Sequence, residues 1–239
     1  MTHRPFDRLR ASLGSGQAIK VARHEWAMVL RDPRFLIPFA AVPLFLILLH
    51  SATLFMLPGN PSQRWLLTRS FLDILSLIGA SMAVPLSADA FAGEKERQTW
   101  ETLLCLPIRR GELFLGKVLG ILPFPLLVGW TAQIIILILS NASGTLQYAY
   151  SSEWIFALLL TPFLSLFFCA LSALISLRSE TVRSAAQFTG LCLLILFPLV
   201  TASSQALLGN FSAQAGALAT LLVGAALCFT LAVRRLKKA

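Results

Sequence analysis

The chain has 239 residues, of which 56% are hydrophobic and 13% are charged, and its mean hydropathy is +0.75. Soluble domains contain about 25% charged residues, so this composition excludes an ordinary water-soluble domain and indicates a membrane protein. The formal net charge of +9 would also suit a nucleic-acid partner. In so apolar a chain, however, a membrane surface explains it better, and we expect no nucleic acid.

The N-terminal segment, residues 1–34, is expected to lie in the cytoplasm and to contain an amphipathic helix. Its apolar face consists of Ile19, Ala22, Trp26, Val29 and Leu30. Lys20, His24 and Arg31 lie away from that face. A core helix of a soluble domain would show the same periodicity, but the apolar run that follows favours a helix on the inner membrane surface.

Six apolar windows are long enough to cross a bilayer, which takes about 20 residues. They are residues 35–57, 72–91, 113–140, 154–177, 184–208 and 213–233. The fifth contains Pro198 and then becomes polar, so we expect that helix to be broken or partly re-entrant. The sequence therefore predicts an all-α membrane protein with a six-span domain at 35–233 and a basic cytoplasmic tail at 234–239.

Prolines occur in each of the first five windows. They are Pro38, Pro43, Pro85, Pro123, Pro125, Pro162 and Pro198. A transporter that rocks between two states can use such kinks, although prolines are also common in ordinary membrane helices. The pattern is compatible with both interpretations.

Positive charge sets the expected orientation. Of the 20 Lys and Arg residues, only Arg64 and Arg69 fall on the side of the membrane that holds the loop between the first two spans. Cytoplasmic loops are enriched in Lys and Arg. Both termini, and the loop between the second and third spans, are therefore expected to face the cytoplasm.

The loop between the second and third spans, about residues 93–112, is unusually polar for this chain. As a helix from Glu94 to about Leu104, it would end before Pro107. Its apolar side would consist of Trp100, Leu103 and Leu104, and its other side of Glu94, Gln98, Glu101 and Cys105. Such a helix offers an apolar side to a groove in a partner protein. The alternative is a solvated helix that only covers the bundle.

Residues 111–118 have the sequence GELFLGKV, which is one residue short of the phosphate-binding loop G-x-x-x-x-G-K-[ST]. Val118 replaces the hydroxyl residue that would hold magnesium, no strand precedes the segment, and a membrane span follows it. We therefore expect no nucleotide site on this chain. Gly116 and Gly120 instead form a small-xxx-small pair, which predicts a close contact between helices.

Few residues suggest other chemistry. The histidines (His3, His24 and His50) are far apart, and no nucleophile motif or pair of intramembrane acids occurs, so we expect no metal, resident cofactor or catalytic residue. The four cysteines are interpreted as small hydrophobic residues. Asp89 and Gln133 are candidates for a translocation path, because polar groups within spans are often functional, and Asp73 is a weaker one.

The polar loop combines, in order, Gly-Glu-x-Glu, Thr, Glu-x-Leu-Leu, Pro, two basic residues and Gly-Lys. The residues in this pattern are Gly93, Glu94, Glu96, Thr99, Glu101, Leu103, Leu104, Pro107, Arg109, Arg110, Gly116 and Lys117. Between the second and third of six spans, this order resembles the first cytoplasmic loop of type-2 ATP-binding-cassette (ABC) exporter permeases. The N-terminal helix with Glu25 and the turn at Arg31-Asp32-Pro33 also resemble that family. The family often has glycine where this chain has Gln98.

The resemblance implies a bacterial plasma-membrane pump of two permease subunits and two cytosolic ATPase subunits, with ATP and magnesium held by the ATPases. The helix from Glu94 to about Leu104 would be a coupling helix that docks on the ATPase. The implied coupling residues are Glu94, Glu96, Thr99, Trp100, Glu101, Leu104, Pro107, Arg109 and Arg110.

Two other functions stay open. One is a non-transporting scaffold or sensor bound to an ATPase, and the other is an intramembrane enzyme, for which the spans offer no convergent catalytic residues. For a pump, the uniformly apolar spans favour an amphiphilic or lipid-like cargo over a small ion.

Overall fold

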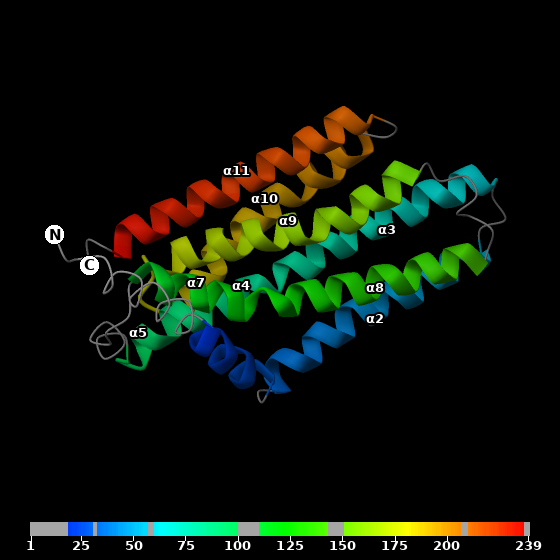
Figure 1. Cartoon of the computed structure of the whole chain (residues 1–239). Coiled ribbons are helices and arrows are strands. Elements are labelled where there is room, and N and C mark those ends of the chain that lie inside the picture. Colours follow the sequence, from blue (N-terminus) through cyan, green and yellow to red (C-terminus); the bar gives the residue numbers. More distant parts are fainter. Residues whose placement is uncertain are drawn as a thin grey trace.

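The computed structural model describes residues 19–30, 33–56, 60–99, 110–142, 151–206 and 210–236, and within these ranges every regular element is a helix. The long helices run roughly along one axis and form an elongated bundle (Figure 1). The predicted all-α class is therefore confirmed.

Within the described ranges, five helical stretches are long and apolar enough to cross a membrane, and the chain is a multi-pass membrane protein. The first is α2 (Pro33–Met56), and the second is a run of α3 (Pro61–Ser81), α4 (Ala83–Ala88), the π-helix η1 (Asp89–Gly93) and α5 (Glu94–Glu96). The third consists of α7 (Arg110–Ile121) and α8 (Pro123–Ala142), and the others are α9 (Ser151–Ser176) and α11 (Phe211–Leu236). They correspond to the first four predicted windows and the sixth.

The fifth predicted window corresponds to α10 (Val182–Ala206), a helix of 25 residues. The break expected at Pro198 is wrong, because the helix continues past it to Ala206. Membrane helices tolerate proline where other groups use the freed carbonyls. In the turn that follows, the hydroxyl of Thr201 donates to the carbonyls of Phe197 and Pro198, each at 3.1 Å. Val182–Pro198 of α10 is an apolar stretch, but it is shorter than the five candidate spans, so a sixth crossing stays a prediction.

Prolines coincide with the two interruptions inside the spans. Met82 separates α3 from α4, and Pro85, which has no N–H group, leaves a carbonyl one turn earlier without its helical donor. Leu122 separates α7 from α8, where Pro123 and Pro125 have the same effect. The second and third spans are therefore each built from shorter helical pieces.

The second span lies at the centre of the bundle, because 72% of its most apolar stretch is buried, against 17% for α2 and 11% for α11. Glycines bring α3, α8 and α9 close together. A Cβ atom added to Gly79 would lie 2.9 Å from the Cα atom of Gly129, and one added to Gly129 would lie 2.6 Å from Cγ2 of Thr161. Small residues at these two positions are what permits this approach.

The helix over residues 19–30 lies at the same end of the bundle as α5 and the last turn of α11 (Figure 1). It packs against α7 and α8: the rings of Trp26 and Phe124 are 4.7 Å apart between centroids. A Cβ atom on Gly120 would lie 2.7 Å from the Cβ of Glu25, which confirms the close helix contact predicted at Gly120. Ile19 and Leu30 are exposed. The apolar face therefore meets the protein in part, and its position on a membrane surface stays a prediction.

Candidate functional site

The site lies where the second span passes into the polar loop, at η1 and α5. The backbone N–H of Ala92 donates to Oγ of Ser176 at 2.9 Å, at the end of α9. The ammonium group of Lys95 donates to the carbonyl oxygens of Ser176, Leu177 and Ser179. A cation that binds the last carbonyls of a helix also matches the negative end of the helix dipole. The start of the loop is thus fixed to the end of α9.

Lys117 of α7 fixes the same segment from another side. Its Nζ atom lies 2.7 Å from Oε1 of Glu25 and 2.6 Å from Oε1 of Glu94, and it donates to the carbonyl of Ala90 at 2.9 Å. The side chain of Lys117 is only 1% exposed, and those of Glu25 and Glu94 are 6% and 15% exposed. A buried cation is tolerated only when it is paired and hydrogen-bonded, and here both conditions hold.

This triad of Glu25, Lys117 and Glu94 joins three parts of the chain that are distant in sequence. They are the helix over residues 19–30, the start of the third span and the start of the polar loop. The close contact at Gly120 lies one turn beyond Lys117 on the same helix. The three segments are therefore held as one unit by an ion pair cluster and by close packing.

The expectation of one continuous helix from Glu94 to about Leu104 is wrong at its start. The helix α5 ends at Glu96, and Gln98 has a φ of 57°. The N–H of Gln98 donates to the carbonyl of Lys95 at 3.0 Å, and that of Thr99 donates to the carbonyl of Glu94 at 2.9 Å. These two bonds and the left-handed residue form a Schellman motif, which ends a helix.

The left-handed position at Gln98 is one that favours glycine, the residue that the resembling family often has there. Glycine adopts a positive φ without steric cost, whereas a residue with a Cβ atom is disfavoured there. Gln98 nevertheless adopts this left-handed conformation in this chain. A docking helix in this loop would have to begin beyond Thr99.

The predicted coupling residues do not share one environment. Glu96 and Thr99 are exposed, whereas Glu94 is directed inward to Lys117. The remaining predicted residues are Trp100, Glu101, Leu104, Pro107 and Arg109, which lie outside the described residues, and Arg110, which begins α7. The structure therefore brings Glu94 together with Glu25 and Lys117, and the docking role of the others stays a prediction.

The two candidates for a translocation path lie in different surroundings. Asp89, at the start of η1, accepts a hydrogen bond from Arg97 at 2.9 Å and is partly exposed. Gln133 is fully buried in the centre of the bundle. The structure does not bring the two residues together.

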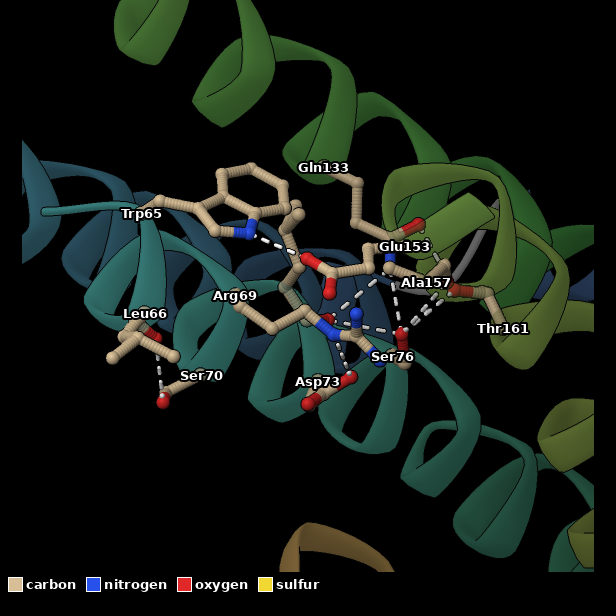
Figure 2. A network of polar contacts seen from close by, with 11 residues as sticks. Trp65, Leu66, Arg69, Ser70, Asp73, Ser76, Gln133, Glu153, Ala157 and Thr161 are labelled. Carbon is tan, nitrogen blue, oxygen red and sulfur yellow. Dashed lines mark hydrogen bonds and ion pairs between the residues drawn. The ribbon is translucent and has the colours of Figure 1, made fainter. Parts of the chain in front are cut away.

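Gln133 belongs to a polar network between α3, α8 and α9 (Figure 2). Its amide nitrogen donates to Oγ of Ser76 at 2.6 Å and to the carbonyls of Leu72 and Ala157 at 3.2 Å, while Thr161 donates to its amide oxygen at 3.0 Å. The same Thr161 meets Gly129 in the close packing described above. In this conformation the network holds the three helices together.

Charged groups lie nearby on the same helices (Figure 2). Arg69 and Asp73 follow one another by one turn on α3, and Nε of Arg69 lies 3.4 Å from Oδ1 of Asp73. Both side chains are almost completely buried. Nε1 of Trp65 donates to Oε2 of Glu153 at 2.6 Å. Asp73 is thus paired within its own helix, as an intramembrane charge requires.

Several of these contacts were missed by reasoning from the sequence alone. Glu25 had a usable signal, because it falls on the same helical face as Ala22 and Val29, three residues before and four residues after it. An acidic residue on an apolar face indicates a buried partner. The capping role of Lys95 had no such signal, since it depends on where α9 ends in space.

Comparison with known proteins agrees with the pattern in the loop. The family model described as "ABC-2 family transporter protein" matches residues 19–222. The chain is also similar to the ABC transporter permease protein NatB of Bacillus subtilis (strain 168), with 30% identity over 135 residues. That alignment covers 53% of this chain and 35% of NatB, so it spans about a third of that relative's length.

The family match begins at the helix that contains Glu25 and extends through the triad into α11. It therefore covers far more of the chain than the loop motif does, and the resemblance to type-2 ABC permeases is confirmed. The chain belongs to the ABC-2 family of transporter proteins.

Proposed function

We propose that this chain is the membrane-spanning permease subunit of an ATP-driven ABC exporter and that a separate cytosolic ATPase docks on the loop beyond Thr99. The family match over residues 19–222 is the observation on which the proposal chiefly rests. In the proposed assembly, two ATPase subunits serve two permease subunits, and both chain termini face the cytoplasm.

The geometry of the triad supports a coupling role for this loop. A displacement of the loop would act directly on Glu94, and through Lys117 on both the third span and the helix over residues 19–30. Lys95 would transmit the same displacement to the end of α9. ATP binding that moves the loop would thereby shift the population of bundle conformations.

The surroundings of Lys117 support a nucleotide site on the partner ATPase instead of this chain. A lysine ammonium group has three N–H donors, and Glu25, Glu94 and the carbonyl of Ala90 provide three acceptors at 2.6–2.9 Å. No donor is left for a phosphate group. We infer that ATP and magnesium bind to the ATPase and that this chain catalyses no hydrolysis.

We also infer that α10 provides the sixth crossing and that the translocation path forms between two permease subunits. Gln133 would reach such a path only if α3, α8 and α9 separated, because it is fully buried among them. Asp89 is closer to the surface of the chain, beside the proposed docking loop.

The experiment is to isolate the tagged chain from its native membranes in mild detergent and to measure ATP hydrolysis. The wild-type sample is expected to contain an ATPase subunit with the G-x-x-x-x-G-K-[ST] motif. We expect the acidic residues of the loop to face basic groups of the ATPase. The double variant Glu96→Lys, Glu101→Lys should then insert normally and lose that subunit, because like charges across an interface cost several kcal/mol. Absence of any such ATPase from the wild-type sample would contradict a permease function.

A matched control is Glu180→Lys. Glu180 is an exposed acidic residue in the turn between α9 and α10, close to Ser179, which accepts a hydrogen bond from Lys95. Its reversal changes the charge by two units, as each of the two reversals in the double variant does, and leaves the residues of the polar loop unchanged. Equal loss of the ATPase in the control and in the double variant would place the docking site elsewhere. If the wild-type chain retains its ATPase but transports no substrate, the scaffold or sensor function is favoured.

A further inference from the structure

A cavity of about 380 Å³ lies between the end of α2, the start of α3 and the end of α8. This is the end of the bundle opposite α5 (Figure 1). Its lining consists of Ser51, Leu54, Phe55, Arg64, Leu139 and Ala142. The volume is in the range of small-molecule sites, and the lining combines one cation and one hydroxyl group with four apolar side chains.

Arg64 is the charged group of this cavity, and its charge is unused in the described part of the chain. It forms no ion pair there, and its Nε atom is buried without a hydrogen-bond acceptor. The first turn of α3 contains no acidic residue. A buried donor without an acceptor is costly, so an anion at this position would remove that cost.

A buried polar cluster lies on the same three helices as the cavity. Nε2 of His50 lies 3.2 Å from Oγ of Ser140, and the hydroxyl of Thr68 lies 3.4 Å from the same oxygen. His50 is next to Ser51 in sequence, and Thr68 is one turn from Arg64. The imidazole of His50 is completely buried, and its Nδ1 atom also has no partner among the described residues. Unsatisfied polar atoms therefore gather in this region of the bundle.

The position of Arg64 points to the type of anion. It is the second residue of the membrane-spanning stretch Gln63–Glu96, so its guanidinium lies where a lipid headgroup would lie. Leu54 and Leu139 belong to the membrane-spanning stretches of α2 and α8. A small hydrophilic anion would leave these apolar walls unused, and a lipid without net negative charge would not compensate the charge of Arg64.

We propose that this cavity binds an anionic phospholipid, with the phosphate on Arg64 and the first part of an acyl chain against Leu54 and Leu139. Guanidinium and phosphate groups form strong charge-assisted hydrogen bonds. The site is distinct from the triad at the other end of the bundle. It depends neither on the ATPase partner nor on which end faces the cytoplasm.

The test measures lipid binding to the purified full-length chain in a neutral maltoside detergent, by native mass spectrometry. Dioleoyl phosphatidylglycerol should bind tightly, and dioleoyl phosphatidylcholine should bind weakly. Arg64→Gln should reduce phosphatidylglycerol affinity by about tenfold or more, which corresponds to one charge-assisted hydrogen bond. The control is Arg183→Gln, which removes an exposed arginine at the start of α10 and should leave affinity unchanged.

Two further arms separate a lipid from a free anion and do not rely on Arg64→Gln being well folded. Leu139→Trp fills the apolar part of the cavity, keeps Arg64 and should weaken phosphatidylglycerol binding. Excess inorganic phosphate added to the wild-type chain should not displace the lipid. The proposal is overturned if phosphate displaces the lipid, if phosphatidylcholine binds equally well, or if both variants keep the wild-type affinity.

Discussion

The ammonium group of Lys117 meets three acceptors, one for each of its N–H bonds, in a place where it is almost completely enclosed. The local sequence GELFLGKV gives no sign of this arrangement, because Glu25 lies 92 residues away in the chain. A single side chain thus connects the N-terminal helix, the polar loop and the third span, and its loss should weaken the contacts among all three.

Replacement of Lys117 by methionine is expected to lower the free energy of unfolding by about 3 kcal/mol or more. It leaves the buried carboxylates of Glu25 and Glu94 without their cation, and breaking a buried ion pair usually costs about 3–5 kcal/mol. Denaturant titration in detergent measures the change. The triple variant Lys117→Met, Glu25→Gln, Glu94→Gln should recover part of it, because no uncompensated charge remains.

The matched control for Lys117 is Lys20→Met. Lys20 is an exposed lysine on the helix over residues 19–30, and its replacement should change stability by no more than about 0.5 kcal/mol. Equal effects of the two substitutions would mean that the triad adds nothing to stability.

Single residues of the site were predictable to different extents. Glu94 and Lys117 were recognised from the loop motif, but their mutual contact was not, because it requires the third span to lie beside η1. The departure at Gln98 was visible in the sequence, and the Schellman motif gives it a physical meaning. Glu94 shows the limit of pattern reasoning: an exposed docking role was expected for a side chain that is largely buried.

At the scale of helices, apolar windows were sufficient to locate five spans, because length and composition decide whether a segment can cross a bilayer. The effect of each proline was not predictable in the same way. The helix continues through Pro162 and Pro198, whereas interruptions occur beside Pro85 and Pro123. At Pro162 the indole N–H of Trp130 donates to the freed carbonyl of Leu158 at 3.0 Å, and a contact of this kind depends on the tertiary structure.

The glycine contact between α3 and α8 yields a prediction at this scale. In Gly79→Ala, the new Cβ atom would lie 2.9 Å from the Cα of Gly129 and 3.2 Å from the carbonyl oxygen of Pro125. Both are backbone atoms, so the helices themselves would have to move apart. Overpacking of this kind costs about 1–3 kcal/mol, and the loss should appear as a lower free energy of unfolding in detergent.

Gly216→Ala is the corresponding control in α11. A Cβ atom on Gly216 meets nothing within 4 Å, and alanine replaces glycine in a helix with a gain of about 0.5–1 kcal/mol. The two variants should therefore differ in sign. If Gly79→Ala were as stable as Gly216→Ala, α3 and α8 could not be as closely packed as the structure has them.

At the scale of the whole molecule, two ends of the bundle differ in charge and in chemistry. One end holds the triad, the cap of Lys95 and the basic last turn of α11, which contains Arg234 and Arg235. The other end holds the cavity with Arg64. Among the described residues, Arg64 and Arg69 are the Lys and Arg residues at this second end, and Arg69 is already paired with Asp73.

This asymmetry predicts the orientation in the membrane, since Lys and Arg are retained on the cytoplasmic side. Single cysteines replace Asn60, the exposed residue before α3, and Glu180, the exposed residue between α9 and α10, in a chain whose four native cysteines are replaced by serine. A membrane-impermeant maleimide should label the cysteine at position 60 in intact cells and the one at position 180 only after the cells are opened. Labelling of both positions in opened cells shows that each is accessible. The reverse pattern in intact cells would place the polar loop outside, where no cytosolic ATPase could reach it, and would contradict both the orientation and the proposed coupling.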